Sequence, residues 1–510
     1  MKVYLLGAGP GDPGLLTLKA RDALAAADAV VYDALANPSL LDHARPDAER
    51  IYVGKIAGRH ALPQDEINAL LIRKAREDGG KVVVRLKGGD PYIFGRGGEE
   101  AEALVAAGVP FEEVPGVSSA IAAPAYAGIP LTHRDFASSV TIITGHESPD
   151  KPGSVHNWPA LAASASTLVF VMGMKNLPDI AASLIRAGMD PATPAALVHR
   201  GTTPRQRCLT APLAELPAAA VAQGFSNPSI IVVGEVTRLH ASLDWFGKKP
   251  LLGRRVVVTR AREQASGLAD RLTRLGAEVI QFPTIEIREL EDYAPLDAAI
   301  AGLDAYDWLI FTSVNGVRHF WRRLAVAGKD SRALAGARVA AIGPATADAL
   351  AQRGITADFL PSRYQAEDVA EGLKALTGAA LSGMRFLLPR ALRARDVLPE
   401  TLRAAGAVVD VVPAYVTVPA AARKDDVLRL LENGELDCVS FGSSSTVENF
   451  LALIPAELLR RHPETALAAI GPVTTATLRG HGLEAAITPR DYTIPALADA
   501  IAAHFSPSRQ

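Results

Sequence analysis

The second half of the chain repeats itself, and this repeat restricts the folds that it can adopt. Four segments recur in one order: VVVTRA at 256–261 as FLLPRA at 386–391, AEVIQFPTIEI at 277–287 as AVVDVVPAYVTV at 407–418, FTSVNGV at 311–317 as FGSSSTV at 441–447, and AAIGPATADALAQRGI at 340–355 as AAIGPVTTATLRGHGL at 468–483. The offset is 130 residues for the first three pairs and 128 for the last. Apolar strands and polar turns that recur at this spacing predict two similar α/β lobes of about 130 residues each.

The whole chain follows an α/β pattern. At 510 residues it exceeds a single hydrophobic core and should form several domains. Short apolar strands, such as VVVRL at 82–86 and TLVFVMG at 167–173, alternate with Ala/Leu-rich helical patterns. The tract HASLDWFGKKPLLGRR at 240–255 interrupts this rhythm with Gly, Pro and cationic residues. We therefore predict a first domain over 1–246, a linker over 247–253 and a second domain over 254–510.

The composition argues against several kinds of partner. The formal net charge is −2 and no basic block is present, so neither nucleic acid nor an anionic membrane surface is expected as the main partner. Only Cys208 and Cys438 are present, which predicts neither a disulfide framework nor a metal site. No stretch approaches the roughly 20 apolar residues of a membrane span, and the first apolar run stops at Gly7 without the features of a secretory signal. A cytoplasmic protein acting on small molecules is the expectation.

The stretch YLLGAGPGDPGLL at 4–16 predicts a backbone-lined ligand pocket at the end of a strand. Gly7 and Gly9 supply the first half of the dinucleotide fingerprint G-x-G-x-x-G, and Asp33 stands where an acid could bind a ribose. Position 12, however, is Asp instead of the third glycine, and its carboxylate would stand where a pyrophosphate should bind. A ligand without phosphates, such as a cationic one, fits this loop better. A nucleotide-dependent oxidoreductase stays as the alternative, with Asp12 as the feature against it.

Two further glycine-containing turns follow in the first half. In RLKGGDPYIFGRGGEE (85–100), Gly88 and Gly89 allow close approach of the backbone to a ligand, and Asp90 either accepts ligand hydrogen bonds or caps a helix. PGVSSAIAAPAYAGIPLTHRD (115–135) adds a Ser-containing turn followed by a basic residue. Both turns are candidates for the same ligand site.

In the second half, polar turns recur at the ends of the repeated strands. Thr312-Ser313 and the serines of 443–445 follow one pair of strands, and Gly343-Pro344 and Gly471-Pro472 follow another. Hydroxyls and backbone N–H groups at helix N-termini can bind carboxylates or phosphates. The same serines and threonines can equally serve as ordinary helix N-caps.

Seven ordered motifs carry a resemblance to a known family. GAGPGDPGLLTLKA, VYDAL, VGKIAG, RLKGGDPYIFGRGGEE, PGVSSAIAAPAYAGIPLTHRD, VFVMG and ALVHRGT occur in the order seen in uroporphyrinogen-III C-methyltransferases, which are S-adenosylmethionine-dependent tetrapyrrole methylases. The second half resembles uroporphyrinogen-III synthase in its two-lobed repeat. The resemblance implies a methylase fold of two α/β subdomains followed by a two-lobed α/β synthase fold. It further implies one lobe over about 254–284 plus 416–510 and another over about 288–413, joined by paired extended segments.

For the first half, the resemblance implies S-adenosylmethionine as cofactor and the formation of precorrin-2, on the branch to sirohaem or cobalamin. It makes Asp33 a proton acceptor and Lys55 a proton donor, and it changes the role of Asp33 from a ribose ligand. The family usually has Thr-Ala where this chain has Ser118-Ser119. A homodimer through this half is expected. The implied cofactor-binding residues are Pro10, Gly88, Gly89, Asp90, Ile93, Ser118, Ser119, Met172 and Gly201, and the expected substrate-binding residues are Arg96, Glu99 and Arg134.

For the second half, the resemblance implies closure of hydroxymethylbilane to uroporphyrinogen III without a cofactor. Tyr415 matches a tyrosine that could donate a proton to the leaving hydroxyl, although a packed strand tyrosine is an equal interpretation. A non-catalytic two-lobed binding domain fused to the methyltransferase is the alternative for this half. The expected substrate-binding residues are Arg260, Ser313, Arg390, Ser443 and Thr474.

Overall fold

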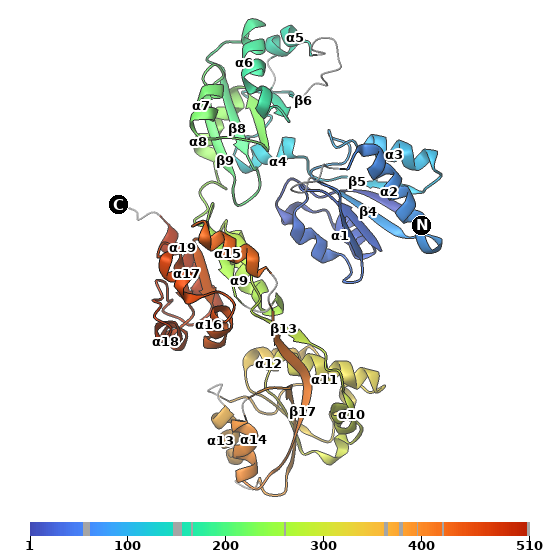
Figure 1. Cartoon of the computed structure of the whole chain (residues 1–510), viewed down its shortest axis with the longest axis vertical. Coiled ribbons are helices and arrows are strands. Elements are labelled where there is room, and N and C mark those ends of the chain that lie inside the picture. The colour runs from blue at the N-terminus through green and yellow to red at the C-terminus, as the bar shows by residue number, and fades with distance from the viewer. Residues whose placement is uncertain are drawn as a thin grey trace.

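The computed structural model contains four β-sheets, each covered by helices (Figure 1). The structure describes residues 1–54, 62–145, 156–164, 167–259, 262–361, 366–376, 381–394, 396–420 and 423–506, without the side chains of 262–266, 366–370 and Pro419. No helix among these residues is both long enough and apolar enough to cross a membrane.

The first sheet is parallel and has the strand order β3-β2-β4-β1-β5. Each strand is an apolar run with a buried centre, as expected for a parallel sheet that is covered on both faces. Because all five strands run the same way, their carboxyl ends lie at one edge, where α/β sheets bind ligands. The strands are β1 (Lys2–Gly7), β2 (Ala29–Tyr32), β3 (Glu49–Tyr52), β4 (Val82–Lys87) and β5 (Phe111–Val114), and the helices are α1 (Leu18–Ala25), α2 (Gln64–Arg76) and α3 (Gly97–Ala106).

The second sheet is mixed and has the order β6-β7-β10-β8-β9. Its central strand β10 runs antiparallel to both neighbours, β7 and β8. Helix α4 leads from the first sheet into this region and packs against β10 and β7. The strands are β6 (Val140–Thr144), β7 (Thr167–Val171), β8 (Pro194–His199), β9 (Arg207–Pro212) and β10 (Ser229–Val233), and the helices are α4 (Ser119–Tyr126), α5 (Trp158–Ala163), α6 (Leu177–Arg186), α7 (Leu216–Ala222) and α8 (His240–Leu243).

The third sheet has the order β12-β11-β18-β19 and is parallel. It takes two strands from the start of the second half and two from its end. The strands are β11 (Arg255–Val258), β12 (Glu278–Gln281), β18 (Cys438–Phe441) and β19 (Ala466–Ala469), and the helices are α9 (Arg262–Arg274), α15 (Lys424–Glu432), α16 (Ser444–Leu451), α17 (Ala456–Arg461), α18 (Pro472–Gly480) and α19 (Ile494–Phe505).

The fourth sheet has the order β13-β17-β16-β14-β15 and is formed by the residues between those two pairs. Its edge strand β13 is antiparallel to β17, whereas the other strands are parallel. The strands are β13 (Ile285–Arg288), β14 (Trp308–Phe311), β15 (Arg338–Ala341), β16 (Arg385–Ala391) and β17 (Val408–Pro419), and the helices are α10 (Ala294–Ala301), α11 (Val314–Val326), α12 (Pro344–Ala351), α13 (Ala366–Leu376) and α14 (Val397–Ala404).

The sequence repeat appears in the third and fourth sheets as one arrangement built twice. Strands β12-β11-β18-β19 correspond in order to β17-β16-β14-β15, which are their partners in the repeat. Even a small irregular contact is duplicated, since a parallel bridge joins Ala340 to Phe359 in one lobe and Ala468 to Ile487 in the other. The expected pairing of extended segments between the lobes is also present, with Ile285 opposite Pro419 and Arg288 opposite Val416.

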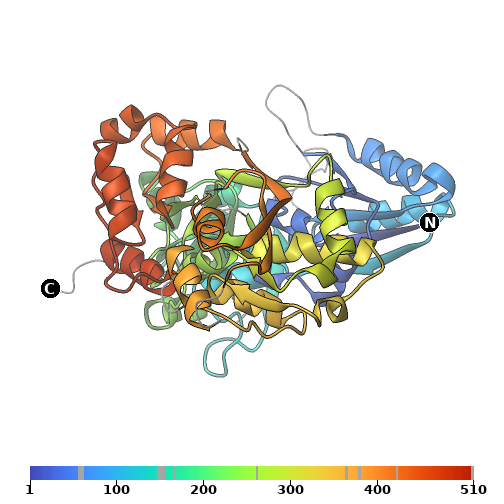
Figure 2. The same cartoon turned by 90° about the horizontal axis from the view of Figure 1, so that it is seen from below.

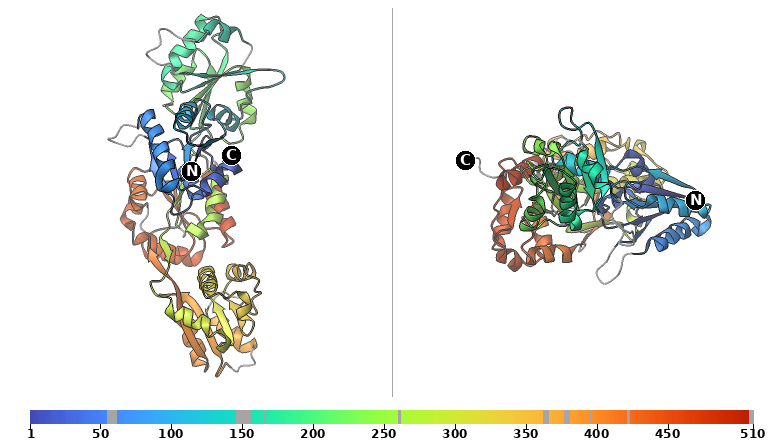
Figure 3. Two further views of the ribbon diagram at one scale, coloured as in Figure 1. Left: turned by 90° about the vertical axis from the view of Figure 1, so that its right-hand side faces the viewer. Right: turned by 90° about the horizontal axis from the view of Figure 1, so that it is seen from above.

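The second, third and fourth sheets follow one another along an elongated molecule, with the second sheet at one end and the fourth at the other (Figures 1 and 3). The first sheet lies to one side, so that β1 and α19 are on opposite sides of the molecule (Figure 2). The two halves meet at a defined junction. Leu251 is fully buried in the core of the third sheet, and the Gly253 N–H donates to Pro204 O at 2.8 Å. Arg205 forms two hydrogen bonds with Glu278, at 2.6 and 2.7 Å, across the junction.

Candidate functional sites

The loops after β1, β4 and β5 converge at the carboxyl edge of the first sheet. Gly9 N–H donates to Gly89 O at 3.2 Å, and Gly89 N–H donates to Gly9 O at 2.8 Å. A Cβ on Gly116 would lie 2.2 Å from Gly89 O and 2.7 Å from Gly7 Cα, so only glycine allows this approach. The three loops therefore form a cradle of closely packed backbone at this edge, and Gly88 and Gly89 lie in it.

Asp90 holds this cradle together. Its Oδ1 accepts from the N–H groups of Tyr92 and Ile93, at 2.8 and 3.1 Å, and its Oδ2 accepts from Gly116 N–H at 3.1 Å. Of the two interpretations of Asp90, the turn-forming one is thus observed. Asp90 can still accept a hydrogen bond from a ligand besides those from Tyr92, Ile93 and Gly116, because two carboxylate oxygens can accept about four hydrogen bonds.

Asp12 does not present its carboxylate to the cradle in the way that its position in the loop suggested. Its Oδ1 accepts from Gly14 N–H at 2.7 Å, which caps a short 3₁₀ turn, and its Oδ2 accepts from the Tyr126 hydroxyl at 2.7 Å. Burial raises the pKa of Tyr126, and the hydrogen bond to Asp12 raises it further, so the phenol stays a donor. The acid therefore fixes the loop after β1 against α4, and Pro10 lies half-buried in the same loop.

The loops after β7 and β8 of the second sheet are the candidate second side of the ligand site, and the loop after β8 contacts the loop after β1 and helix α4. Ser229, the first residue of β10, pairs with His199 at the end of β8, and β10 also pairs with β7, so the two loops leave the sheet at one edge. Gly201 lies in the loop after β8, where a Cβ would lie 2.2 Å from Ala123 Cβ in α4. The Asp12 N–H donates to Thr202 Oγ1 at 3.2 Å and so joins the loops of the two sheets.

Backbone strain is concentrated around these loops. Positive φ angles occur at Phe94 (54°), Arg96 (60°), Met172 (55°), Arg200 (47°) and Thr202 (68°), all in the loops after β4, β7 and β8. Such angles are costly for residues other than glycine, and they cluster at ligand sites. Met172 would be a core residue by its type alone, but it is 50% exposed. Its strained and exposed position supports the cofactor-binding role that the resemblance implies.

Ser118 and Ser119 stand at the start of α4 beside the cradle. Ser118 is the N-cap residue, and its hydroxyl accepts from Ala120 N–H at 3.3 Å. Ser118 is buried, while Ser119 is half-buried and Ile93 is exposed. The predicted cofactor-binding residues thus lie in the loops that follow strands of the first and second sheets or at the start of α4.

The proposed proton acceptor, Asp33, directly follows β2 at the same edge. Its Oδ1 accepts from Leu35 N–H at 3.1 Å, and its Oδ2 accepts from the Arg85 guanidinium at 3.1 Å. Leu35 also packs over Gly88, where a Cβ would lie 2.5 Å from Leu35 Cβ. Asp33 is therefore next to the cradle. Lys55, the proposed proton donor, lies outside the described residues.

The expected substrate-binding residues of this half are exposed. Arg96 and Glu99 form a two-pronged ion pair, with Nε–Oε1 and Nη2–Oε2 distances of 2.8 and 2.6 Å. The hydrogen bond from Arg96 lowers the pKa of Glu99, and Glu99 in turn raises that of Arg96. Arg134 is exposed in the turn between His133 and Ala137.

In the fourth sheet, three of the predicted synthase residues come together. Ser313 follows β14 and caps α11, and its hydroxyl is 3.0 Å from the Tyr415 hydroxyl in β17. Arg390 precedes Ala391, the last residue of β16, which lies opposite Tyr415; Arg390 is buried and donates to Asp396. Burial raises the pKa of Tyr415, while the bond to Ser313 opposes this rise. The result is a protonated phenol within β17, opposite the end of β16.

In the third sheet, the matching positions form a second polar edge. Ser443 caps α16 through a capping box with Thr446, so the N-cap interpretation holds for both Ser313 and Ser443. Ser444 Oγ donates to Val473 O at 3.4 Å and links this turn to the start of α18, in which Thr474 is buried. Arg260 lies outside the described residues.

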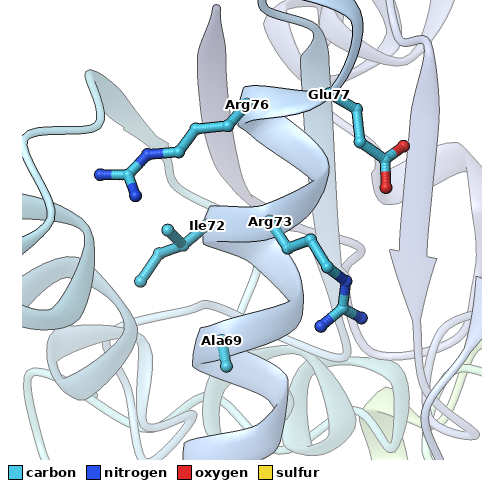
Figure 4. Close-up of a pocket in the computed structure, with 5 residues that line it drawn as sticks. All are labelled: Ala69, Ile72, Arg73, Arg76 and Glu77. Carbon is cyan, nitrogen blue, oxygen red and sulfur yellow. The ribbon is translucent and has the colours of Figure 1, made fainter.

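A surface hollow on α2 is separate from both edges (Figure 4). It is lined by Ala69, Ile72, Arg73, Arg76 and Glu77, with Ile72 and Arg76 directed to one side of the helix and Arg73 and Glu77 to the other. None of the predicted site residues lines it. Among the described residues, no group of three or more His, Cys, Asp or Glu side chains is arranged to hold a metal ion.

No sequence motif pointed to the buried charged residues that contact Asp33 directly or through Arg85. Arg85 and Lys87 are buried in the central strand β4 and contact the buried Glu100 of α3. The available signal was the pair of cations in the otherwise apolar strand VVVRLK, since buried charges in a sheet need partners. The motif analysis also missed Tyr126 and Thr202, which join loops distant in sequence.

Comparisons with known proteins match the two halves of the chain to two different families. The family model of tetrapyrrole (corrin/porphyrin) methylases matches residues 2–217, and that of the uroporphyrinogen-III synthase HemD matches residues 266–499. The porphyrin biosynthesis protein HemD of Ruminiclostridium josui is 40% identical over 460 residues, which cover 90% of each chain. The uroporphyrinogen-III C-methyltransferase of Bacillus subtilis (strain 168) is 45% identical over 332 residues, 65% of this chain and 68% of that protein. A crystal structure of uroporphyrin-III C-methyltransferase from Thermus thermophilus complexed with S-adenosylhomocysteine is 42% identical, with 47% of this chain and 100% of that chain covered and a TM-score of 0.40.

Proposed function

We propose, because the chain belongs to the tetrapyrrole methylase family over residues 2–217 and to the uroporphyrinogen-III synthase family over residues 266–499, that it catalyses two consecutive steps of tetrapyrrole biosynthesis. The second half closes hydroxymethylbilane to uroporphyrinogen III. The first half then transfers two methyl groups from S-adenosylmethionine to this product, which gives precorrin-2. The observation that carries the proposal is the pairing itself, since the product of one family is the substrate of the other and a 40% identical relative spans both halves.

The cradle of the first half fits S-adenosylmethionine. This cofactor has no phosphate, so it does not need a helix N-terminus that binds a pyrophosphate. Because Gly7, Gly89 and Gly116 have no side chains and lie in close contact, their backbone groups are available to contact the cofactor. It supplies an activated methyl group on a sulfonium. The residues that would hold it are Pro10, Gly88, Gly89, Asp90, Ile93, Ser118, Ser119, Met172 and Gly201.

The chain's own residues then position the substrate and move a proton. Asp33, fixed at both oxygens by Leu35 N–H and Arg85, accepts the proton that the macrocycle loses. The substrate is an octacarboxylate, and guanidinium groups bind carboxylates in a two-pronged way. Arg96 and Arg134 bind it, and Arg96 exchanges Glu99 for a substrate carboxylate. Lys55 acts as proton donor.

The synthase half binds and folds a flexible octacarboxylate between its lobes. Ser313 and Arg390 on the fourth sheet, and Arg260, Ser443 and Thr474 on the third, bind its carboxylates. Tyr415 donates a proton to the leaving hydroxyl, a role supported by burial, which keeps the phenol protonated. No observation on the described residues favours a nucleotide-dependent oxidoreductase or a non-catalytic second half.

The division into residues 1–246, a linker over 247–253 and residues 254–510 is part of the proposal, as are a homodimer through the first half and a cytoplasmic location. Leu251, within the proposed linker, packs into the core of the third sheet, so the end of this segment is anchored to the second half.

The test is an incubation of the purified full chain with hydroxymethylbilane, with and without S-adenosylmethionine. Uroporphyrinogen III without the cofactor, and methylated product with it, would support both activities. Formation of only the non-enzymatic type I ring would remove the synthase assignment, and type III ring that stays unmethylated would remove the methyltransferase assignment.

A further inference from the structure

A cluster of four charged side chains lies at and below the edge of the first sheet. Arg85 and Lys87 are 3% and 5% exposed on the central strand β4, and Glu100 on α3 is 0% exposed. Asp33 closes the cluster at the surface, with 26% of its side chain exposed. Charged residues are almost never buried to this degree unless they are paired, so the contacts among them need an account.

The four charges form a chain of alternating sign. Lys87 Nζ donates to Glu100 Oε1 at 2.9 Å, Arg85 Nε donates to the same oxygen at 3.2 Å, and Arg85 Nη2 donates to Asp33 Oδ2 at 3.1 Å. Gln64 adds a neutral donor to Glu100 Oε1 at 3.2 Å. Two cations and two carboxylates leave the cluster without net charge, which makes its burial tolerable.

The pKa of Lys87 reflects the opposing effects of burial and of its charged neighbours in the cluster. Burial lowers the pKa of Lys87, the neighbouring Arg85 lowers it further, and Glu100 opposes both. Without Glu100, two cations on the same face of one strand would repel each other in a place that excludes water. Glu100 therefore lets Arg85 stay charged and directed toward Asp33, while Lys87 supplies the positive charge that balances Glu100.

The cluster does more than is needed to fill space. Apolar side chains of similar volume stabilise a buried site at least as well as an ion cluster. This cluster instead ends on one half-exposed carboxylate, whose other oxygen is held by Leu35 N–H at 3.1 Å. Among the described residues, the charged groups that face Asp33 are Arg85 and Lys87 of β4, with Glu100 of α3 behind them.

We propose that Arg85, held in place by Glu100 and Lys87, is a positioning residue for Asp33 in methyl transfer. This inference rests on the proposed function, in which Asp33 accepts a proton. The hydrogen bond from Arg85 fixes the direction of the Asp33 carboxylate, so that lone pairs not used by Arg85 or Leu35 N–H are available at the cradle.

The test compares Arg85→Met, Arg85→Lys and Glu100→Gln in the full chain. A general base contributes roughly 10²- to 10⁴-fold, so Arg85→Met should lower kcat for methyl transfer by about 10-fold to 100-fold. The KM for S-adenosylmethionine should change by less than about twofold, because Arg85 touches no cofactor-binding residue. Arg85→Lys, which keeps the charge, should retain more of the wild-type kcat than Arg85→Met. Glu100→Gln should give an intermediate loss.

The double variant Asp33→Asn with Arg85→Met separates positioning from general damage. If Arg85 acts through Asp33, the double variant should be no slower than Asp33→Asn alone. An equal further loss when Arg85→Met is added to Asp33→Asn, or no rescue of kcat by Arg85→Lys, would overturn the inference. Lys74→Met, which removes a partly buried cation on α2 that pairs with Glu49 and Glu77, is the matched control and should retain the wild-type rate.

A failure of the proposed function would look different. In that case the wild-type chain would not methylate uroporphyrinogen III at all. If the wild type methylates but Asp33→Asn has the same rate, Asp33 is not the base and the inference about Arg85 falls with it, although the function stands.

Discussion

Replacing Gly116 by alanine tests whether the three converging loops form the cofactor site. The added Cβ would lie 2.2 Å from Gly89 O and 2.7 Å from Gly7 Cα, whereas ordinary contacts begin at 3.4 Å. Both neighbours are backbone atoms that cannot rotate away, so the loops must separate by about 1 Å. Overpacking of this kind costs about 1–3 kcal/mol, and the rigid surroundings favour the upper end. We expect cofactor binding to weaken by about 100-fold, since each 1.4 kcal/mol is about a factor of 10.

The assay is calorimetric titration of S-adenosylhomocysteine into wild type, Gly116→Ala and a control, Gly98→Ala. A Cβ on Gly98 would meet nothing within 4 Å, so the control should bind like wild type. The synthase activity of the same samples is an internal check of folding and should be unchanged. Wild-type affinity in Gly116→Ala, with normal synthase activity, would refute the assignment of the cofactor to this cradle.

Three further predictions concern the junction, the synthase half and the strained loop. Burial alone would raise the pKa of Glu278, but hydrogen bonds, including that from Arg205, outweigh it and lower the pKa below 4.5. The pair therefore stabilises the junction above pH 4.5, by about 1 kcal/mol because it is partly exposed, and this is lost as the pH falls through the folded-state pKa. Arg205→Ala should speed trypsin cleavage in the linker at pH 7, and an unchanged rate would contradict this. Proteolysis of wild type and Arg205→Ala by an acid protease at about pH 3 should show no difference between them. Tyr415→Phe should lower the synthase rate by at least about 10-fold if the phenol is the acid, and a change within about twofold, in a direct rate assay, would leave it a packing residue. Met172→Gly should relieve backbone strain of about 1 kcal/mol and raise the melting midpoint of the first half by roughly 2–4 °C while methyl transfer falls; a lower midpoint in calorimetry would speak against stored strain.

The repeat predicted the architecture of the second half well, because it recorded strands and turns together. Both Ser313 and Ser443 follow matched strands and cap matched helices, as duplicated local sequence requires. Glycine positions were similarly informative, since a Cβ on Gly88 or Gly116 would lie 2.5 or 2.2 Å from a neighbouring atom and a side chain cannot fit there. These features depend on residues close in sequence, or on the lack of a side chain, and both can be read directly.

The direction of individual side chains was less accessible. Asp12 appeared to face the ligand, but its partner is Tyr126, which is 114 positions away and was not part of any motif. Met172 looked like core because apolar type alone says nothing about a positive φ angle. The cluster around Arg85 was visible only as two cations in an apolar strand, and the acid that completes it comes from another element.

The most direct test of the central claim is the mass and isomer type of the product from one incubation. Purified full chain receives hydroxymethylbilane and S-adenosylmethionine with a deuterated methyl group. The account predicts a type III macrocycle carrying two deuterated methyl groups, with formation of the type III ring independent of the cofactor. A type I ring, or a type III ring without label, would contradict the claim that one chain performs both steps.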